Sequence, residues 1–223
     1  MKSCILIPAY NCYSAIAEVV SKIKALDLEV VVVDDGSVDE TGDAARSAGA
    51  TVLRHDKNMG KGASMIKGFN YILKNIPCDW ILTMDGDGQH NPEEIKTFLA
   101  KGGSENEGIV VGNRMSSPGS MPIVRRATNF FMSGLISFLC GQRIYDTQCG
   151  FRLIRCSLLE SIRVESRNYD IETEMLIRAS QKGYKITSLP IEAIYKGEVS
   201  RINPFMDTLR FFGLLARIYL IKK

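Results

Sequence analysis

Several features that would assign the chain to a class of protein are absent or scarce. The 223 residues include one tryptophan and two histidines, and none of the six cysteines forms the C-x-x-C spacing of a zinc or redox motif. We interpret them as reduced thiols of a cytoplasmic protein. No stretch reaches the about 18–20 uncharged apolar residues of a membrane-spanning helix, which excludes a transmembrane protein. The apolar run at residues 4–7 meets Pro8 and is too short for a secretory signal, so we expect no export.

The chain also lacks a strong excess of charge of one sign. Lysine and arginine total 28 against 25 acidic residues, a net charge of +3, which is too mild to indicate a nucleic-acid partner. A hydrophobic content of 45% is close to that of soluble globular proteins, so a sizeable core can form. At roughly 100–200 residues per domain, the length favours one large domain over two small ones.

Short apolar runs alternate with segments of helical periodicity in the first half of the chain. Runs of four or five β-branched or aliphatic residues are typical of strands buried on both faces of a parallel sheet. We expect strands at residues 4–7, 29–33, 51–53, 80–84 and 109–111, and helices at residues 15–26, 40–48, 60–73 and 92–99. This pattern predicts an α/β fold with a mostly parallel central sheet flanked by helices.

The second half is less regular. Residues 113–122 are rich in turn formers and are expected to form a long loop. After it we expect helices at residues 125–140 and 170–182, strands at 151–154 and 185–195, and a terminal helix at 203–220. The predicted organisation is one domain at residues 1–203, with halves at 1–112 and 113–203, followed by an amphipathic helix at 204–223.

Two carboxylates follow the predicted fourth strand, in the run from Met84 to His90. Asp85 and Asp87 are separated only by Gly86, so they can converge on one cation, and Mg²⁺ and Mn²⁺ prefer such oxygen ligands. A diphosphate would complete the coordination sphere. An ordinary Asp-Gly turn is the alternative interpretation, and the neighbouring strand ends argue against it.

Those neighbouring strand ends carry polar groups as well. Asp34 follows the second strand, and Tyr10 and Asn11 follow the first, at the sheet edge where open α/β folds bind ligands. Lys61 lies between two glycines at the start of a predicted helix, which suits a phosphate at the positive helix terminus. Capping of the next helix by Ser37 and Asp39 is expected in addition.

Taken in order, the segments P-A-Y-N, V-V-D-D-G-S, N-M-G-K-G, D-G-D-G-Q-H-x-P, G-N-R and Q-C-G-F-R-L resemble a known family. From Ile5 to about Phe212 the chain resembles the inverting family 2 glycosyltransferases, which have the GT-A fold. The branch it resembles contains the polyprenyl-phosphate sugar transferases, such as dolichyl-phosphate mannose synthases and bactoprenol glucosyltransferases.

The resemblance implies that residues 1–112 bind a nucleotide sugar and residues 113–203 bind the acceptor. It implies Mg²⁺ or Mn²⁺ at Asp85, Asp87 and Gln89. Together with the strand-end groups, the expected donor contacts are Pro8, Tyr10, Asn11, Val32, Asp34, Lys61, Asp85, Gly86, Asp87, Gln89, Arg114, Arg125 and Arg201. The arginines would contact phosphates.

The acceptor decides which further residues the reaction needs. A phosphate acceptor is ionised at pH 7 and needs no strong general base, whereas a hydroxyl acceptor needs one, for about 10²–10⁴-fold in rate. Asp146 is the preferred carboxylate on the acceptor side, with Asp170, Glu172 and Glu174 as alternatives. The expected catalytic residues are Asp87, Asp146 and Arg125.

Two predicted helices have the composition of helices that lie in a membrane interface. The terminal helix carries an apolar face beside arginines and lysines, and Arg125 and Arg126 precede the apolar residues of the helix at 125–140. Packing on the sheet or on a second subunit is the alternative, and a homo-oligomer stays open.

The sequence therefore predicts a metal-dependent enzyme that transfers a hexose to polyprenyl phosphate at the cytoplasmic membrane face. Transfer to a sugar hydroxyl of a cell-envelope polysaccharide, and a noncatalytic sugar-nucleotide binding module, are the alternatives. The base and sugar of the donor, GDP-mannose or UDP-glucose among others, are not determined.

Overall fold

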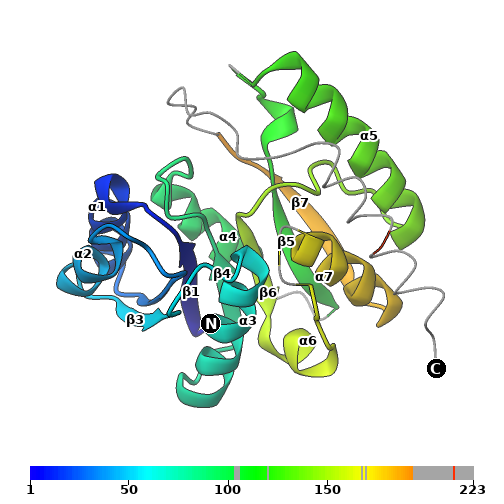
Figure 1. Cartoon of the computed structure of the whole chain (residues 1–223). Coiled ribbons are helices and arrows are strands. Elements are labelled where there is room, and N and C mark those ends of the chain that lie inside the picture. Colours follow the sequence, from blue (N-terminus) through cyan, green and yellow to red (C-terminus); the bar gives the residue numbers. More distant parts are fainter. Residues whose placement is uncertain (103–105, 120, 167, 169, 193–212, 214–223) are drawn as a thin grey trace.

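A seven-stranded sheet forms the centre of the molecule, with the strand order β3-β2-β1-β4-β6-β5-β7 (Figure 1). The structure is a computed structural model and describes residues 1–102, 106–119, 121–166, 168, 170–192 and 213. The strands are β1 (Ser3–Ala9), β2 (Glu29–Asp34), β3 (Thr51–Arg54), β4 (Trp80–Thr83), β5 (Glu107–Asn113), β6 (Arg152–Arg155) and β7 (Lys185–Pro190). All neighbouring pairs are parallel except those of β6, which runs antiparallel to β4 and β5. The predicted α/β fold with a mostly parallel sheet is confirmed.

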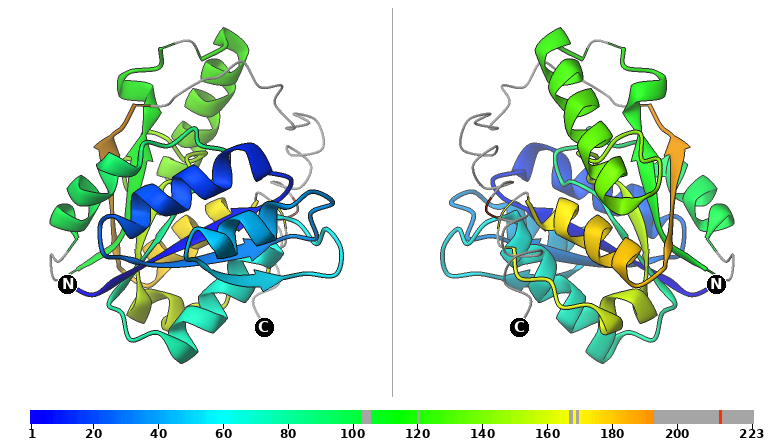
Figure 2. Two further views of the ribbon diagram at one scale, coloured as in Figure 1. Left: turned by 90° about the vertical axis from the view of Figure 1, so that its left-hand side faces the viewer. Right: turned by 90° about the vertical axis from the view of Figure 1, so that its right-hand side faces the viewer.

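Helices cover both faces of this sheet (Figures 1 and 2). α3 and α7 contact each other on one face, while α1 contacts η1, just ahead of α4, on the other. The helical segments are α1 (Tyr13–Lys24), α2 (Thr41–Ser47), α3 (Lys61–Asn75), η1 (Pro92–Glu94), α4 (Ile95–Lys101), η2 (Arg114–Ser116), α5 (Ile123–Cys140), α6 (Cys156–Ser161) and α7 (Asp170–Gln181). Because helices cover both faces of the sheet, the central strands are buried on both sides, and this explains why their sequences are unbroken apolar runs.

The register of β1, β2 and β4 brings the carboxyl ends of these strands to one edge. Pro8 pairs with Val33 and Ala9 with Asp34, and β4 ends beside Leu6 of β1. The apolar residues of β1 and β2 are almost completely buried and form the middle of the core. The loops that leave this edge are therefore held by a rigid base, which is a favourable place for a ligand site.

The elements differ from the sequence prediction mainly at their ends. The helix expected at 92–99 is a short 3₁₀ turn, η1, followed by α4, and the loop expected at 113–122 contains η2. The six-residue helix α6 was not predicted. The strand expected to reach residue 195 is described as far as Pro190, and the terminal helix expected at 204–223 lies outside the described residues apart from Gly213. Among the helices that the structure describes, none has the length and apolar character to cross a membrane.

Candidate active site

A lysine lies between two carboxylates at the edge of the sheet where β1, β2 and β4 end. We call this edge, together with the loops that leave it, the crevice. Asp85 lies two residues after the end of β4, and its Oδ1 lies 2.6 Å from Nζ of Lys61, the first residue of α3. The same Nζ lies 2.7 Å from Oε1 of Glu172, in the first turn of α7. Three elements far apart in the sequence thus meet in one ion-pair cluster. Of the three acidic residues considered in the α7 segment, Glu172 is the one that reaches Asp85 through Lys61.

The charges of this cluster stabilise one another. Burial disfavours a charged Asp85, but Lys61, and to a smaller extent Arg114, lower the pKa of Asp85 to about 2. Burial likewise disfavours a charged Lys61, and the two carboxylates outweigh it and raise the pKa of Lys61. Both groups are therefore ionised at neutral pH. The electrostatic influence of Arg114 on Asp85 also indicates that the β5 end borders the same crevice.

Gly150 makes room for this cluster. A Cβ atom at this position would lie 2.7 Å from Oδ2 of Asp85 and 2.9 Å from Nζ of Lys61. Nearby, the guanidinium of the fully buried Arg152 donates hydrogen bonds to the backbone carbonyls of Cys149 (2.7 Å) and Glu172 (2.6 Å). The Q-C-G-F-R-L segment thus positions the ion-pair cluster.

His90 supports the loop that carries Asp85 and Asp87. Its ring is buried and packs against Phe151, with 5.3 Å between the ring centres. Burial lowers the pKa of His90 to about 4, so the ring is neutral at pH 7. Its Nδ1 accepts a hydrogen bond from the backbone N–H of Asp85 at 3.3 Å. Asp87 Oδ1 accepts one from the N–H of Gln89 at 3.0 Å, so the loop is held on both sides.

Asp146 and Arg114 form a buried, bidentate ion pair. Arg114 Nε lies 2.8 Å from Oδ2 of Asp146, and Nη2 lies 3.0 Å from Oδ1. Asn129 of α5 donates a further hydrogen bond to Oδ1 at 2.7 Å. Burial opposes the charge on Asp146, but these partners lower its pKa below the usual range. The side chain of Asp146 is completely buried, and its hydrogen bonds orient Arg114.

Two acidic residues at the end of β2, Asp34 in the strand and Asp35 just after it, organise the first half of the crevice. Asp34 is completely buried, accepts the N–H of Ser37 at 2.9 Å and lies 3.4 Å from Nη1 of Arg54. Asp35 accepts hydrogen bonds from the N–H groups of Met59 (2.9 Å) and Gly60 (2.8 Å), the residues that precede Lys61. Asp35 therefore sets the start of α3, a role that the sequence did not indicate.

The other predicted donor residues fall into three groups. Pro8 is half-buried near the end of β1, Tyr10, Asn11 and Gln89 are half-buried on loops at the crevice edge, and Arg125 is half-buried in the first turn of α5. The side chain of Val32 is fully buried within β2, two residues before the strand ends, so the structure does not bring it to the crevice surface. Arg201 lies outside the described residues.

The residues after β4 suit a divalent cation. Asp85 and Asp87, with the amide oxygen of Gln89, offer hard oxygen ligands of the kind that Mg²⁺ and Mn²⁺ take. The contact between Asp85 and Lys61 shows that this carboxylate already attracts a cation. The described residues contain no group of three or more histidine, cysteine or acidic side chains placed to hold a metal. Further ligands would therefore come from a bound diphosphate or from water.

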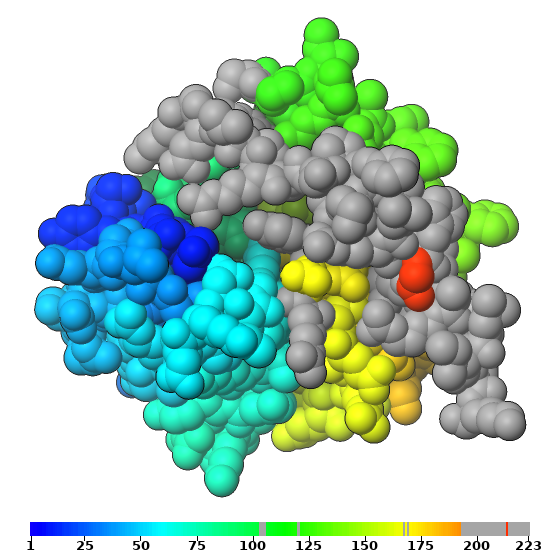
Figure 3. All heavy atoms as spheres, viewed as in Figure 1, coloured from blue at the N-terminus to red at the C-terminus, as the bar shows by residue number. Residues whose placement is uncertain are grey.

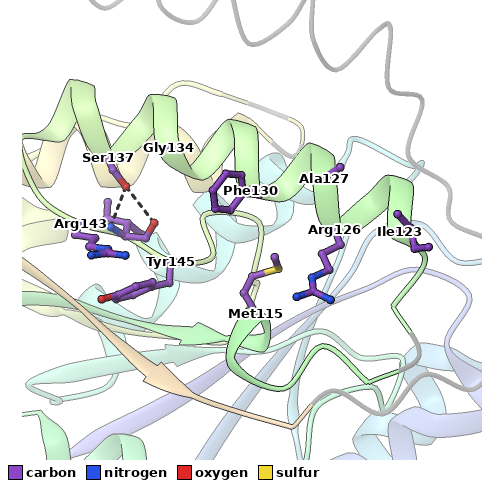
Figure 4. A pocket seen from close by; sticks show the side chains of 10 residues that line it. Met115, Ile123, Arg126, Ala127, Phe130, Gly134, Ser137, Arg143 and Tyr145 are labelled. Carbon is purple, nitrogen blue, oxygen red and sulfur yellow. Dashed lines mark hydrogen bonds between the residues drawn. The ribbon is translucent and has the colours of Figure 1, made fainter.

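A largely apolar groove of about 770 Å³ runs along α5 (Figure 4). It begins at Met115, the neighbour of Arg114, and ends at Ile144 and Tyr145, the neighbours of Asp146. Arg126 and Arg143 also line it. The outer surface of α5 is apolar too, because Phe130, Phe131 and Phe138 are 70–83% exposed, and α5 stands out at the upper right of the molecule in Figure 3.

Nothing in the sequence indicated several of these contacts. Lys61 and Glu172, or Asn129 and Asp146, meet only because the sheet order brings their elements together. For Gly150 the glycine itself was a weak signal, since a glycine between a cysteine and an apolar strand marks a close approach.

Comparisons with known proteins agree with this geometry. The model of the family "Glycosyl transferase family 2" matches residues 4–163. A dolichyl-phosphate hexose transferase of Haloferax volcanii is 31% identical over 207 residues, which are 90% of this chain and 86% of that protein. An undecaprenyl-phosphate mannosyltransferase of Micrococcus luteus is 28% identical over 204 residues, 86% of this chain and 83% of that protein.

The fold is similar to that of solved GT-A enzymes. A glucosyl-3-phosphoglycerate synthase from Mycobacterium tuberculosis, solved with Mn²⁺, uridine diphosphate and glucosyl-3-phosphoglycerate, matches with a TM-score of 0.75 and 18% identity. The match covers 100% of this chain and 81% of that one. The expected GT-A fold is thereby confirmed. Because the family model spans most of the chain and the motifs line one crevice, the chain belongs to glycosyltransferase family 2.

Proposed function

We propose that this enzyme moves a hexose from a nucleoside diphosphate sugar to a polyprenyl phosphate, with inversion and with Mg²⁺ or Mn²⁺. The relatives named above act, by their names, on dolichyl phosphate or undecaprenyl phosphate. We place the reaction at the cytoplasmic face of a membrane, where such an acceptor presents its phosphate.

The observation that carries this proposal is that three candidate carboxylates, Asp85, Glu172 and Asp146, are each held in an ion pair. Within the described residues, Asp85 and Glu172 pair with Lys61, and Asp146 pairs with Arg114. The two histidines are occupied as well, His55 by Asp35 and His90 by the N–H of Asp85. An acceptor hydroxyl would need a base to remove its proton, whereas a phosphate oxygen is already ionised. The site therefore favours a phosphate acceptor.

The residues of the crevice fit a displacement at the anomeric carbon. An acceptor phosphate oxygen forms the new bond as the bond to the nucleoside diphosphate breaks, and the leaving group takes the electron pair. Lys61 and Arg114 are placed to stabilise the negative charge on that diphosphate, and Arg125 and Arg201 are proposed to assist. A divalent cation held by Asp85, Asp87 and Gln89 would supply further charge stabilisation for the leaving group. We propose that Asp146 positions Arg114 instead of transferring a proton.

α5 is the described element that best suits a lipid acceptor. Its exposed phenylalanines, its groove and the two arginines in that groove can accept an isoprenoid chain beside a phosphate. The groove reaches the chain neighbours of Arg114 and Asp146, so a lipid bound there would have its phosphate close to the crevice.

A transfer assay tests the proposal. The purified enzyme is incubated with Mn²⁺ and radiolabelled GDP-mannose, UDP-glucose or UDP-N-acetylglucosamine, with and without polyprenyl phosphate in detergent micelles. We expect one donor to give a chloroform-soluble, acid-labile product only when polyprenyl phosphate is present. Transfer to a sugar hydroxyl of a soluble oligosaccharide at equal rate would instead support the polysaccharide alternative.

A further inference from the structure

Two cysteines meet at the end of the sheet opposite the crevice. Cys78 precedes β4, and Cys156 begins α6 directly after β6, with 3.6 Å between the two Sγ atoms. The backbone holds this contact, because the N–H of Cys156 donates to the carbonyl of Asp79 at 2.9 Å. The antiparallel pair of Trp80 and Arg155 continues the ladder next to it. The contact thus lies directly beside the β4–β6 ladder, with Cys78 two residues before β4 and Cys156 one residue after β6.

The geometry requires little movement to join the two sulfurs. Both cysteines are free thiols in the structure. A disulfide bond is about 2.0 Å long, so the sulfurs need to approach by about 1.6 Å, within reach of side-chain rotation on a fixed backbone. The other described cysteines show no such pairing: Cys4, for example, has a backbone carbonyl as its partner.

The two thiols also differ in reactivity. Cys78 is half-buried, whereas Cys156 is buried. The contact between the two thiols lowers the pKa of Cys78 and raises the pKa of Cys156. The more accessible thiol is therefore the one that ionises first, as in a pair with an attacking and a resolving cysteine.

We propose that Cys78 and Cys156 form a reversible dithiol–disulfide site that reacts with low-molecular-weight disulfides. The Cys78 thiolate attacks one sulfur of the small disulfide, a mixed disulfide forms, and one small thiolate leaves. Cys156, having lost its proton to solvent, then attacks Sγ of Cys78 and expels the second small thiolate. Two protein thiols are oxidised and one small disulfide is reduced to two thiols.

The place of this site in the fold sets its effect. β4 is the last strand of the parallel block and β6 is the first strand beyond it, so the bond would tie the two halves of the sheet together. Cys78 lies seven residues before Asp85 in the sequence, which corresponds to about 23 Å along a strand. We therefore expect the disulfide to change stability and to leave the crevice chemistry unchanged.

The experiment oxidises the native full-length protein with excess oxidised glutathione at neutral pH and then alkylates the remaining thiols in denaturant. We expect four of the six cysteines to be alkylated, and non-reducing peptide mapping to link the peptides of Cys78 and Cys156. The melting temperature should rise by about 5–10 °C because the bond closes a long loop, and dithiothreitol should reverse the rise.

Two variants complete the test. Cys78→Ser should abolish both the cross-link and the rise in melting temperature, while Cys140→Ser, a matched change at a buried cysteine of α5, should retain both. Glutathione retained on Cys78 without a cross-link, or a cross-link that forms only in denaturant, would overturn the proposal. So would six alkylatable cysteines after oxidation.

Discussion

Lys61 is the residue on which the charge balance of the site depends. Its ammonium group lies within 2.7 Å of both Asp85 and Glu172. One positive charge between two negative charges leaves the cluster with a small net charge. We propose that Asp85 turns to the cation when a cation and a diphosphate bind, while Glu172 retains Lys61. The charges of the crevice can therefore be balanced both with and without its ligands.

The first prediction concerns the substitution of Asp85. Replacing it by asparagine removes a charged oxygen ligand and the partner of Lys61, so we expect transfer to fall by at least about 10²-fold. Binding of Mn²⁺ in the presence of the nucleoside diphosphate, measured by electron paramagnetic resonance, should weaken in parallel. Asp43→Asn is the matched control, because Asp43 forms an exposed pair with Arg46 on α2. Unchanged Mn²⁺ binding by Asp85→Asn would contradict the assignment of this carboxylate to the metal.

Asp146 provides a test between positioning and proton transfer. In Asp146→Asn the guanidinium of Arg114 remains buried without its charged partner, so we expect a loss of about 3–5 kcal/mol in the free energy of unfolding, measured with urea. Transfer should also fall, but the pH profile of kcat/KM should keep its shape. If Asp146 took a proton from the acceptor, the variant would instead lose an acidic limb of that profile.

The lowered pKa of His90 predicts how the stability of the fold depends on pH. Its pKa is about 4 in the folded chain and about 6.5 when unfolded, so between these values the unfolded chain binds more protons. Stability should therefore fall as pH decreases from about 6.5 to about 4, by up to about 3 kcal/mol from this group alone. Urea denaturation of His90→Gln should show a smaller decrease than the wild type over this range. Equal slopes for the wild type and His90→Gln would count against the prediction.

At the scale of elements, the sequence predicted most strands and the motifs that follow them. Val30 to Val33 form an unbroken apolar run because both faces of β2 are covered, and the acidic residues after β2 and β4 mark the ends of those strands. The predicted α/β fold and the edge that carries the motifs follow from such local patterns. Periodicity alone could not predict α6, which has only six residues and no side-chain cap.

The contacts between elements could not be predicted in the same way. Glu172 looked like an ordinary acidic residue of a first helical turn, and only the neighbouring positions of α3 and α7 bring it to Lys61. Asp146 was expected to be available to an acceptor, but Arg114 and Asn129 enclose it from two other elements. Val32 was expected at the donor site because of the family resemblance, and the structure shows that its side chain is fully buried in the core.

α5 is the element for the next prediction. Replacing Phe130, Phe131 and Phe138 together by serine should leave the fold intact, because these side chains are 70–83% exposed. Binding to vesicles that contain anionic lipid should weaken by about 10-fold or more, since each phenylalanine can contribute about 1.5 kcal/mol or more when buried in a lipid interface. Sedimentation with the vesicles measures this. Val38→Ser, at an apolar residue that is 90% exposed next to α2, is the control and should bind like the wild type. Equal sedimentation of the triple variant would show that α5 does not face lipid.

At the scale of the whole molecule, two parts of the sheet carry different groups of the site. The parallel block β3-β2-β1-β4 supplies the loops expected to hold the nucleotide, and the strands beyond β6 carry Arg114, α5 and Glu172. The cluster around Lys61 is the point where the two parts meet. With a net charge of only +3, the molecule has no general attraction to anionic lipid, so any such attraction must come from local groups.

The last prediction concerns the segment that follows this domain. The sequence of residues 204–223 combines an apolar face with cations, and each cation near an anionic surface can contribute about 1 kcal/mol. The cations are Arg210, Arg217, Lys222 and Lys223. We therefore expect the full chain to sediment with anionic vesicles at low salt and to dissociate at high salt, because salt screens these charges.

A chain ending at Asn203 provides the comparison. It should bind the vesicles more weakly, and its KM for a long-chain polyprenyl phosphate should rise, while its affinity for the nucleotide, measured by calorimetry with Mn²⁺, should stay the same. The proposed donor site lies at the carboxyl ends of β1, β2 and β4, which the truncation does not touch. A water-soluble, short-chain polyprenyl phosphate should be used equally well by both chains, because its tail gains little from a membrane. Identical sedimentation of the two chains, with an unchanged KM for the long-chain acceptor, would assign residues 204–223 to packing and leave α5 as the lipid-facing element.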